Sequence, residues 1–82
     1  MPKELIVQLF GITREIIGAR QIEVEASSAS RVSDLLALLR DRYPALGGLR
    51  SLLVAVNGEY ADPDQPVSVN DEIALIPPVS GG

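Results

Sequence analysis

Residues 52–56 read Leu-Leu-Val-Ala-Val, an apolar run that lies between Ser51 and Asn57. Successive side chains of a strand point to opposite faces of a sheet, so this run is apolar on both faces. A strand of that kind belongs in the middle of a sheet, and a single helix could cover only one of its faces. The Asn57-Gly58 pair that follows is typical of a tight turn, so residues 59–61 are predicted to return as an edge strand.

Three further segments, residues 4–10, 21–25 and 72–76, alternate with the period of a strand. The residues expected to point inward are Leu5, Val7, Leu9, Ile22, Val24, Ile73 and Leu75. The residues expected to point outward are Glu4, Ile6, Gln8, Phe10, Gln21, Glu23, Glu25, Ala74 and Ile76. The outer face of residues 21–25 is fully polar, whereas that of residues 4–10 is partly apolar.

The one predicted helix follows the second strand. Its apolar residues Val32, Leu35, Leu36 and Leu39 recur at the spacing of a helix face, and Asp34 falls in the first turn. The candidate N-caps are Ser27, Ser28 and Ser30. The helix is expected to end near Tyr43, because Pro44 disfavours helical geometry in the residue before it. Residues 11–18 are expected to form a loop that the Ile16-Ile17 pair pins to the core.

This order of elements is a hairpin, one helix and then further strands. It predicts an α+β protein of the β-grasp (ubiquitin-like) type, with a mixed sheet of four or five strands and one main helix on one face. The predicted domain covers residues 1–78, and residues 79–82 are expected to be a flexible tail.

Charge and composition exclude several classes of partner. The chain of 82 residues has a formal charge of −4, and its seven basic residues form no stripe, so nucleic acid is not expected as a partner. No apolar stretch approaches the roughly 18 residues of a membrane span, and the N-terminal residues resemble no signal peptide, so no membrane partner and a cytoplasmic location are expected.

The chain contains neither Cys nor His, and so it lacks thiol and imidazole nucleophiles and the usual zinc ligands. We therefore expect no bound metal and no cofactor held by this chain. Carboxylates remain, but Asp62 and Asp64 lie in one predicted turn and Asp71 and Glu72 follow Asn70 in another. They are interpreted as solvated turn residues.

The C-terminal residues are Pro77-Pro78-Val79-Ser80-Gly81-Gly82. Two prolines cannot continue a sheet, so the chain is expected to leave the domain there. Six extended residues reach about 20 Å, and two glycines without a Cβ would pass through a narrow channel. We therefore interpret the carboxyl of Gly82 as the working group, delivered into the active site of another protein.

The outward side chains give a second candidate site. Ile6, Phe10, Ala55 and Ile76 are predicted to share the face away from the helix, with Tyr60 beside them. A cluster of apolar side chains on neighbouring strands is typical of an interaction surface, so these five residues are predicted to bind a partner. Arg14 and Glu15 are interpreted as structural or solvated.

Residues 71–82, Asp-Glu-Ile-Ala-Leu-Ile-Pro-Pro-Val-Ser-Gly-Gly, resemble the terminal signature of the MoaD/ThiS family of ubiquitin-like sulfur carriers, in particular molybdopterin synthase small subunits. Phe10, the Arg14-Glu15 pair, Gly18 and Ala55-Val56-Asn57 also fall where that family places similar residues. Ile76 departs from it, since an aromatic residue often stands there.

The resemblance implies a function for the tail. An E1-like (MoeB-type) adenylating enzyme would use ATP to adenylate Gly82, and a sulfur donor would convert the adenylate to a thiocarboxylate. A molybdopterin synthase large subunit (MoaE-type) would bind the carrier in a heterotetramer. Sulfur would then pass to a pterin precursor in molybdenum cofactor biosynthesis.

Three alternatives stay open. The same tail chemistry serves carriers for thiamin, cysteine or tRNA thiolation. It also serves ubiquitin-like modifiers, in which the terminal carboxyl forms an isopeptide bond with a lysine. A non-covalent β-grasp module with an incidental tail is the third, and it would be indifferent to loss of Gly81-Gly82.

Overall fold

The computed structural model describes residues 3–49 and 51–77. Five strands, two α-helices and two 3₁₀ turns follow one another along the chain. Their order and bounds are β1 (Glu4–Leu9), α1 (Ile12–Ile17), β2 (Gln21–Glu25), η1 (Ala26–Ser28), α2 (Val32–Arg42), η2 (Pro44–Gly48), β3 (Leu53–Val56), β4 (Glu59–Tyr60) and β5 (Ile73–Ile76). Within these ranges, no helix is long and apolar enough to cross a membrane.

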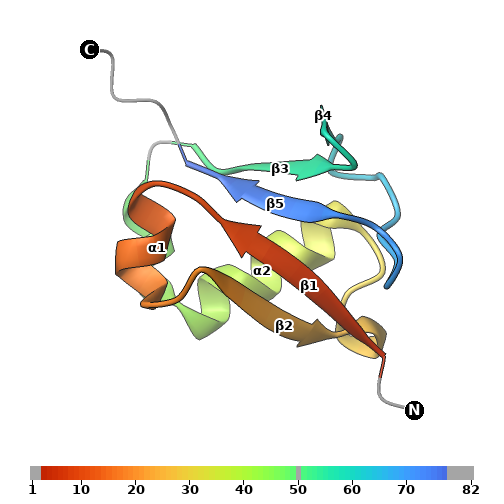
Figure 1. Ribbon diagram of the computed structural model, residues 1–82. Helices are drawn as coiled ribbons and strands as arrows, with labels where there is room; N and C mark the ends of the chain where they lie inside the picture. The colour runs from red at the N-terminus through yellow and green to blue at the C-terminus, as the bar shows by residue number, and fades with distance from the viewer. Residues whose placement is uncertain (1–2, 50, 78–82) are drawn as a thin grey trace.

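The five strands form one mixed sheet in the order β2-β1-β5-β3-β4 (Figure 1). β1 and β5 are parallel neighbours, and the other pairs are antiparallel. The predicted α+β fold of β-grasp type, with five strands and one main helix, is confirmed. β3 has a neighbour on both sides, as the apolar run at residues 52–56 predicted, and β4 is an edge strand, as is β2.

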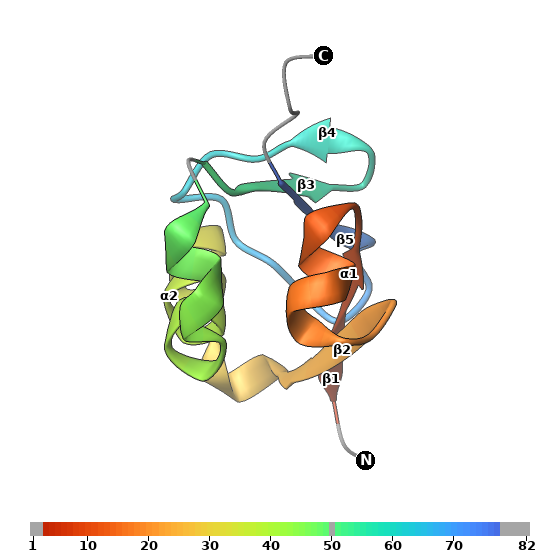
Figure 2. The same ribbon diagram turned by 90° about the vertical axis from the view of Figure 1, so that its left-hand side faces the viewer.

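The core lies between the sheet and α2, which covers one face and leaves the other uncovered (Figure 2). The strands alternate as predicted, and every residue expected to point inward is buried or packs against the core. Among the residues that the structure describes, the side chains with no exposed surface are Leu5, Val7, Leu9, Thr13, Leu35, Leu39, Ile73 and Leu75.

α2 ends where Pro44 predicted, since the backbone N–H of Tyr43 makes the last helical bond, to Leu39 O. Its start differs from the prediction, because Arg31 and none of the serines occupies the N-cap. Asp34 reaches back from the first turn, and its Oδ2 accepts bonds from Arg31 N at 3.1 Å and from Ser30 N at 3.3 Å. The carboxylate thus satisfies backbone donors that precede the helix, which is one half of a capping box.

The prediction of a loop at residues 11–18 was wrong, because this segment contains the helix α1. Gly18 ends the helix with φ 84°, and its N–H donates to Arg14 O at 2.7 Å. That left-handed conformation is readily adopted by glycine. The helix has only six residues, too few to show a helical period. Ile16 and Ile17 pack against the core as expected.

Asn57 and Gly58 form the predicted tight turn between β3 and β4, with φ 54° and 85°. Two positive values are characteristic of a type I′ hairpin turn. Asn57 also joins the turn to the chain before β5, since its Nδ2 donates to Asp71 Oδ1 at 3.0 Å and its Oδ1 accepts from Glu72 N at 2.9 Å.

Asp71 lies in a turn, as predicted, since its N–H donates to Ser68 O at 3.0 Å, but the prediction missed the structural role of its carboxylate. The second oxygen of this half-buried carboxylate, Oδ2, accepts from Ser68 N at 2.8 Å. The bonds from Asn57 and Ser68 hold the pKa of Asp71 below its ordinary value. Asp71 therefore organises the loop that leads into β5.

Candidate functional site

The face of the sheet away from α2, here called the open face, carries an apolar patch. The patch consists of Phe10, Leu53, Ala55, Tyr60, Ala74 and Ile76. Ala74 pairs with Ala55 across β5 and β3, and Ala55 pairs with Tyr60 on the edge strand. Leu53 pairs with Ile76 one step nearer the end of the sheet. Registered pairs on one face lie about 5 Å apart, so these side chains form one surface.

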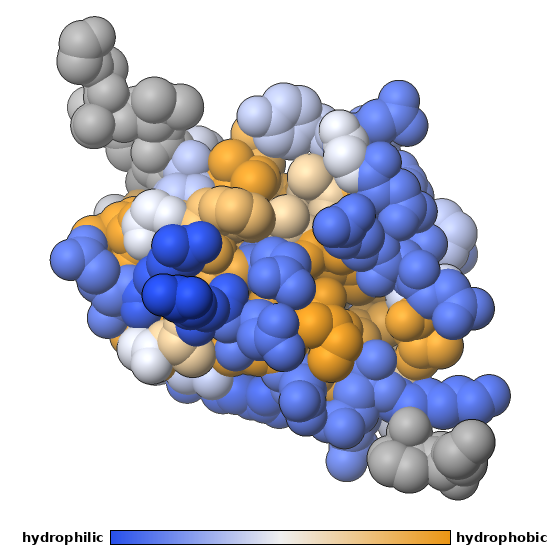
Figure 3. All heavy atoms as spheres, viewed as in Figure 1, coloured by the Kyte–Doolittle hydropathy of each residue, from blue (hydrophilic) through white to orange (hydrophobic). Residues whose placement is uncertain are grey.

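Phe10 extends this surface onto the end of β1. Leu9 pairs with Leu75 in the parallel ladder, which places the next residues, Phe10 and Ile76, at the same level. The patch includes three large exposed hydrophobic side chains, Phe10 at 43%, Leu53 at 47% and Tyr60 at 71%. The space-filling view of the open face shows apolar surface over the ends of β3 and β5 and hydrophilic surface along the β2 edge (Figure 3).

The five predicted partner-binding residues do not all come together. Phe10, Ala55, Tyr60 and Ile76 lie in the patch, and their binding role stays a prediction. Ile6 is half-buried on the same face, but Gln8 separates it from Phe10 along β1, and its partner across β2 is Glu23. Ile6 therefore lies outside the patch, toward the polar end of the sheet.

The alternation of the strands could have found two patch residues that the prediction omitted. Leu53 is two residues before Ala55, and Ala74 is two residues before Ile76, so each shares a face with a residue that was named. Ile12 at the start of α1 is a further exposed apolar side chain, at 41%. No strand period reaches it, because it follows the turn at Gly11.

The chain leaves the sheet at the same end as the patch. β5 ends at Ile76, and half-buried Pro77 follows against Gly11. A Cβ on Gly11 would lie 3.1 Å from Pro77 Cγ, and Gly11 adopts φ 57° and ψ −135°, a conformation open essentially to glycine alone. Gly11 thus allows the close approach of Pro77. The predicted tail residues Pro78, Val79, Ser80, Gly81 and Gly82 lie outside the described residues.

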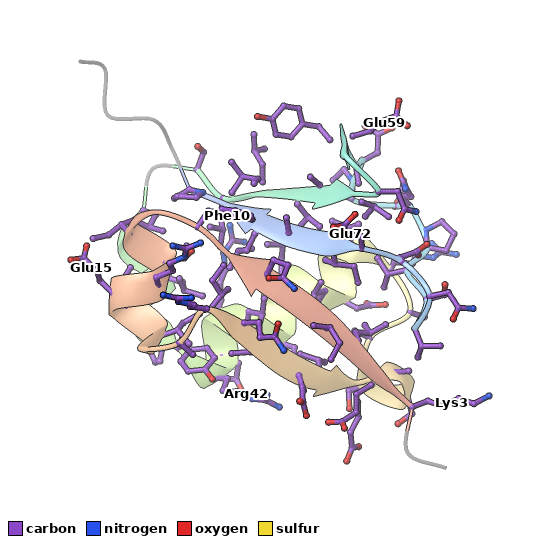
Figure 4. All side chains as sticks on the ribbon, in the orientation of Figure 1. Lys3, Phe10, Glu15, Arg42, Glu59 and Glu72 are labelled. Atoms are coloured by element: carbon purple, nitrogen blue, oxygen red, sulfur yellow. The ribbon has the colours of Figure 1, made fainter. Side chains whose placement is uncertain are left out.

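Arg14 borders the patch from α1. Its Nε donates to Leu9 O at 2.8 Å, and its guanidinium carbon lies 5.4 Å from the centre of the Phe10 ring. That distance is within the range of a cation–π contact. Arg14 therefore has contacts of the structural kind that were expected, while Glu15 is exposed and points away from Phe10 (Figure 4). The interpretation of Arg14 and Glu15 as structural or solvated residues stays a prediction.

The other end of the sheet is acidic. Glu4 pairs with Glu25 across β1 and β2, and Glu23 lies nearby opposite Ile6. Repulsion chiefly from Glu23 raises the pKa of Glu4 above its ordinary value. Among residues 3–49 and 51–77, no group of three His, Cys, Asp or Glu side chains is arranged so that it could hold a metal ion.

Comparison with known proteins gives a family match over nearly the whole chain. The family model described as the ThiS family matches residues 7–82. A molybdopterin synthase sulfur carrier subunit of Dictyostelium discoideum is 38% identical, with 100% of both chains covered. Small archaeal modifier protein 1 of Haloferax volcanii is 36% identical, over 92% of this chain and 97% of its own.

Solved structures agree with the fold. A putative molybdopterin converting factor subunit 1 from Pyrococcus furiosus has a TM-score of 0.81 and 25% identity, over 93% of this chain and 98% of its own. A complex of subunits 1 and 2 of molybdopterin-converting factor from Helicobacter pylori matches with a TM-score of 0.66 and 26% identity, over 96% of this chain and 99% of the matched one.

Proposed function

This chain belongs to the ThiS family, and from that premise we propose that it is a sulfur carrier whose working group is the C-terminal carboxyl of Gly82. One geometric observation supports the proposal most directly. The apolar patch and the exit of the chain at Pro77 lie at the same end of the sheet. A partner that covers Phe10 and Ile76 would therefore receive the residues that follow Pro77.

The proposed chemistry belongs to the terminal group. An E1-like (MoeB-type) adenylating enzyme joins the carboxyl of Gly82 to AMP from ATP and releases pyrophosphate. A sulfur donor then displaces AMP and leaves a thiocarboxylate. The chain contributes no Cys or His to these steps, so the partner supplies ATP binding and catalysis. The task of this chain is to dock and to present its C-terminus.

We further propose that the acceptor partner is the large subunit of a molybdopterin synthase (MoaE-type), in a heterotetramer, and that the sulfur goes to a pterin precursor. Two findings support this assignment. Molybdopterin synthase sulfur carrier subunits are relatives over the full chain, and the matched Helicobacter pylori structure is a complex of subunits 1 and 2 of the converting factor.

The direct test is the mass of the intact protein after incubation with an E1-like enzyme, ATP and a sulfide source. Replacing one terminal oxygen by sulfur adds roughly 16 Da. A gain of that size, confined by fragmentation to Gly82 and absent without ATP, is the expected result. A chain that keeps its original mass, while a known carrier in the same mixture gains sulfur, would refute the proposal.

A second candidate function is protein modification, which the 36% identity to small archaeal modifier protein 1 favours. Here the activated carboxyl of Gly82 would form an isopeptide bond with a lysine of a target. An antibody to this chain would then detect a ladder of larger conjugates in cells that disappears when Gly81-Gly82 is deleted. A single band at the size of the free chain would leave the sulfur carrier as the function.

A further inference from the structure

The turn that joins β1 to α1 is held by hydrogen bonds that converge on Phe10. Thr13 is fully buried and is the one buried polar side chain among residues 3–49 and 51–77. Its hydroxyl oxygen accepts a bond from Phe10 N at 3.0 Å and donates to Phe10 O at 2.5 Å. The hydroxyl of Thr13 therefore bonds to both backbone groups of Phe10. Phe10 O also accepts from Thr13 N at 3.2 Å, whereas Phe10 N donates to the hydroxyl.

These bonds act at the point where the ladder of the sheet stops. β1 ends at Leu9, so the conformation of Phe10 is not set by strand pairing. The contacts of Arg14 described above act at the same place, through Leu9 O and the Phe10 ring. A partly exposed aromatic side chain thus has a backbone anchored from beneath and a ring flanked by a fixed guanidinium.

The hydroxyl is not needed to fill space. Valine has nearly the shape of threonine and would bury the same volume without the cost of removing a hydroxyl from water. What the hydroxyl adds is a defined position for Phe10. An anchor that is already ordered before binding loses less conformational entropy when the partner arrives, and this raises affinity.

We propose that Thr13 is a positioning residue for docking, whose hydroxyl holds Phe10 in the orientation that the partner binds. The inference rests on the proposed function, in which Phe10 belongs to the docking patch. Thr13 itself touches no partner, since it has no exposed surface. Its effect on binding passes through Phe10.

The test compares Thr13→Val with Thr13→Ser in binding to a purified molybdopterin synthase large subunit, measured by calorimetry. Thr13→Val removes both side-chain bonds to Phe10, and we expect Kd to rise about tenfold, which corresponds to about 1.4 kcal/mol at 25 °C. Thr13→Ser keeps the hydroxyl and should stay within about twofold of the native Kd. If Thr13→Val does not fold, Thr13→Cys replaces it, since a thiol is only a weak donor and acceptor.

A double-mutant cycle with Phe10→Ala separates positioning from general support of the fold. In the Phe10→Ala background, Thr13→Val should change Kd by less than about twofold, because the side chain that it positions is gone. An equal rise in both backgrounds, or no rise in either, would overturn the role of Thr13.

Phe10→Ala alone distinguishes the two ways of failing. If it weakens binding while Thr13→Val does not, the docking surface stands and the positioning role is wrong. If Phe10→Ala leaves Kd unchanged, the docking surface itself is wrong and the role of Thr13 falls with it.

Discussion

Leu9 and Phe10 are neighbours in the chain, but Leu9 is completely buried whereas 43% of Phe10 is exposed. The same contrast runs along β5, where Ile73 and Leu75 face the core and Ala74 and Ile76 face the opposite way. The inner residues are explained by folding, since α2 packs on them. The outer apolar residues contribute little to that core, and their accumulation on adjacent strands is typical of an interaction surface.

The largest effect is expected at the C-terminal tail, where a change should abolish activity and leave the fold intact. Deleting Gly81-Gly82 should abolish ATP–pyrophosphate exchange with an E1-like enzyme, because the carboxyl would end two residues short of its target. The melting temperature should stay nearly unchanged, since the core is built from side chains between Leu5 and Leu75 and the last residues of a domain usually contribute little to its stability. Adding one residue after Gly82 should also suppress exchange, because it moves the carboxyl by about 3.3 Å.

Gly81→Val keeps the carboxyl in place and should slow exchange, because a branched side chain narrows the backbone conformations available in a channel shaped for glycine. Exchange by the truncated or extended chain at the native rate would show that Gly82 is not the working group.

Substitutions on the inner face of the sheet should lower the stability of the protein. Leu9→Ala removes a fully buried side chain beside the parallel β1–β5 pair and should lower the free energy of unfolding by about 2–5 kcal/mol, measured in urea. Folded molecules of this variant should still bind the large subunit, because the substitution keeps the exposed side chains of the patch and the backbone O of Leu9 that accepts from Arg14. A loss below about 1 kcal/mol would mean that the strand contributes less to the core than its burial indicates.

Substitutions in the patch on the outer face of the sheet should weaken binding to the partner. Phe10→Ala should weaken binding to the large subunit by about 1–3 kcal/mol in calorimetry, as expected for an aromatic anchor. The free energy of unfolding should change by less than about 0.5 kcal/mol, the usual range for surface positions. Ile6→Ala, on the strand that leads to Phe10, provides the control because Ile6 lies outside the patch, and the Kd of this variant should stay close to the native value.

The smallest effect is expected at the far end of the sheet, where Asp71 has a structural task only. Hydrogen bonds in the folded state lower the pKa of Asp71. The charged carboxylate therefore stabilises the native state at pH values above its ordinary pKa of 3.8. That contribution is lost as the pH falls through the lowered pKa. Asp71→Asn should therefore melt earlier than the native chain at pH 7, and the difference should shrink in acid. If the difference in melting temperature does not depend on pH, the substitution acts through the geometry of the hydrogen bonds and not through the charge.

Local sequence patterns predicted much of this molecule. The period of two placed the inner residues of β1 and β5, Pro44 placed the end of α2, and Asn57-Gly58 placed the hairpin turn. Each of these features depends on residues close together in the chain. The Gly-Gly end likewise needs only the order of residues to suggest its chemistry.

Features that depend on contacts between residues far apart in the sequence were not predicted. Asp71 depends on Asn57, 14 residues earlier, and only the pairing of β3 with β5 brings them together. Gly11 depends on Pro77, at the other end of the chain. α1 is short, and besides one backbone bond from Thr13 N to Phe10 O its contacts with Phe10 and Leu9 come from the side chains of Thr13 and Arg14. Neither the helix nor these contacts with the patch can be read from a hydrophobic period.

The place of β5 between β1 and β3 has a consequence for the synthesis of this protein. β1–β2 and β3–β4 are local hairpins, but within the sheet only the strand at residues 73–76 joins them, through a parallel pairing with the first strand. Pairing of strands so distant in sequence is slow, and it cannot begin until β5 has emerged from the ribosome. A chain cut short before Ile73 would have two unlinked hairpins, and no row of Phe10, Ile76 and Leu53 for a partner to recognise. The patch can therefore form only after the strand that leads to Pro77 has been made.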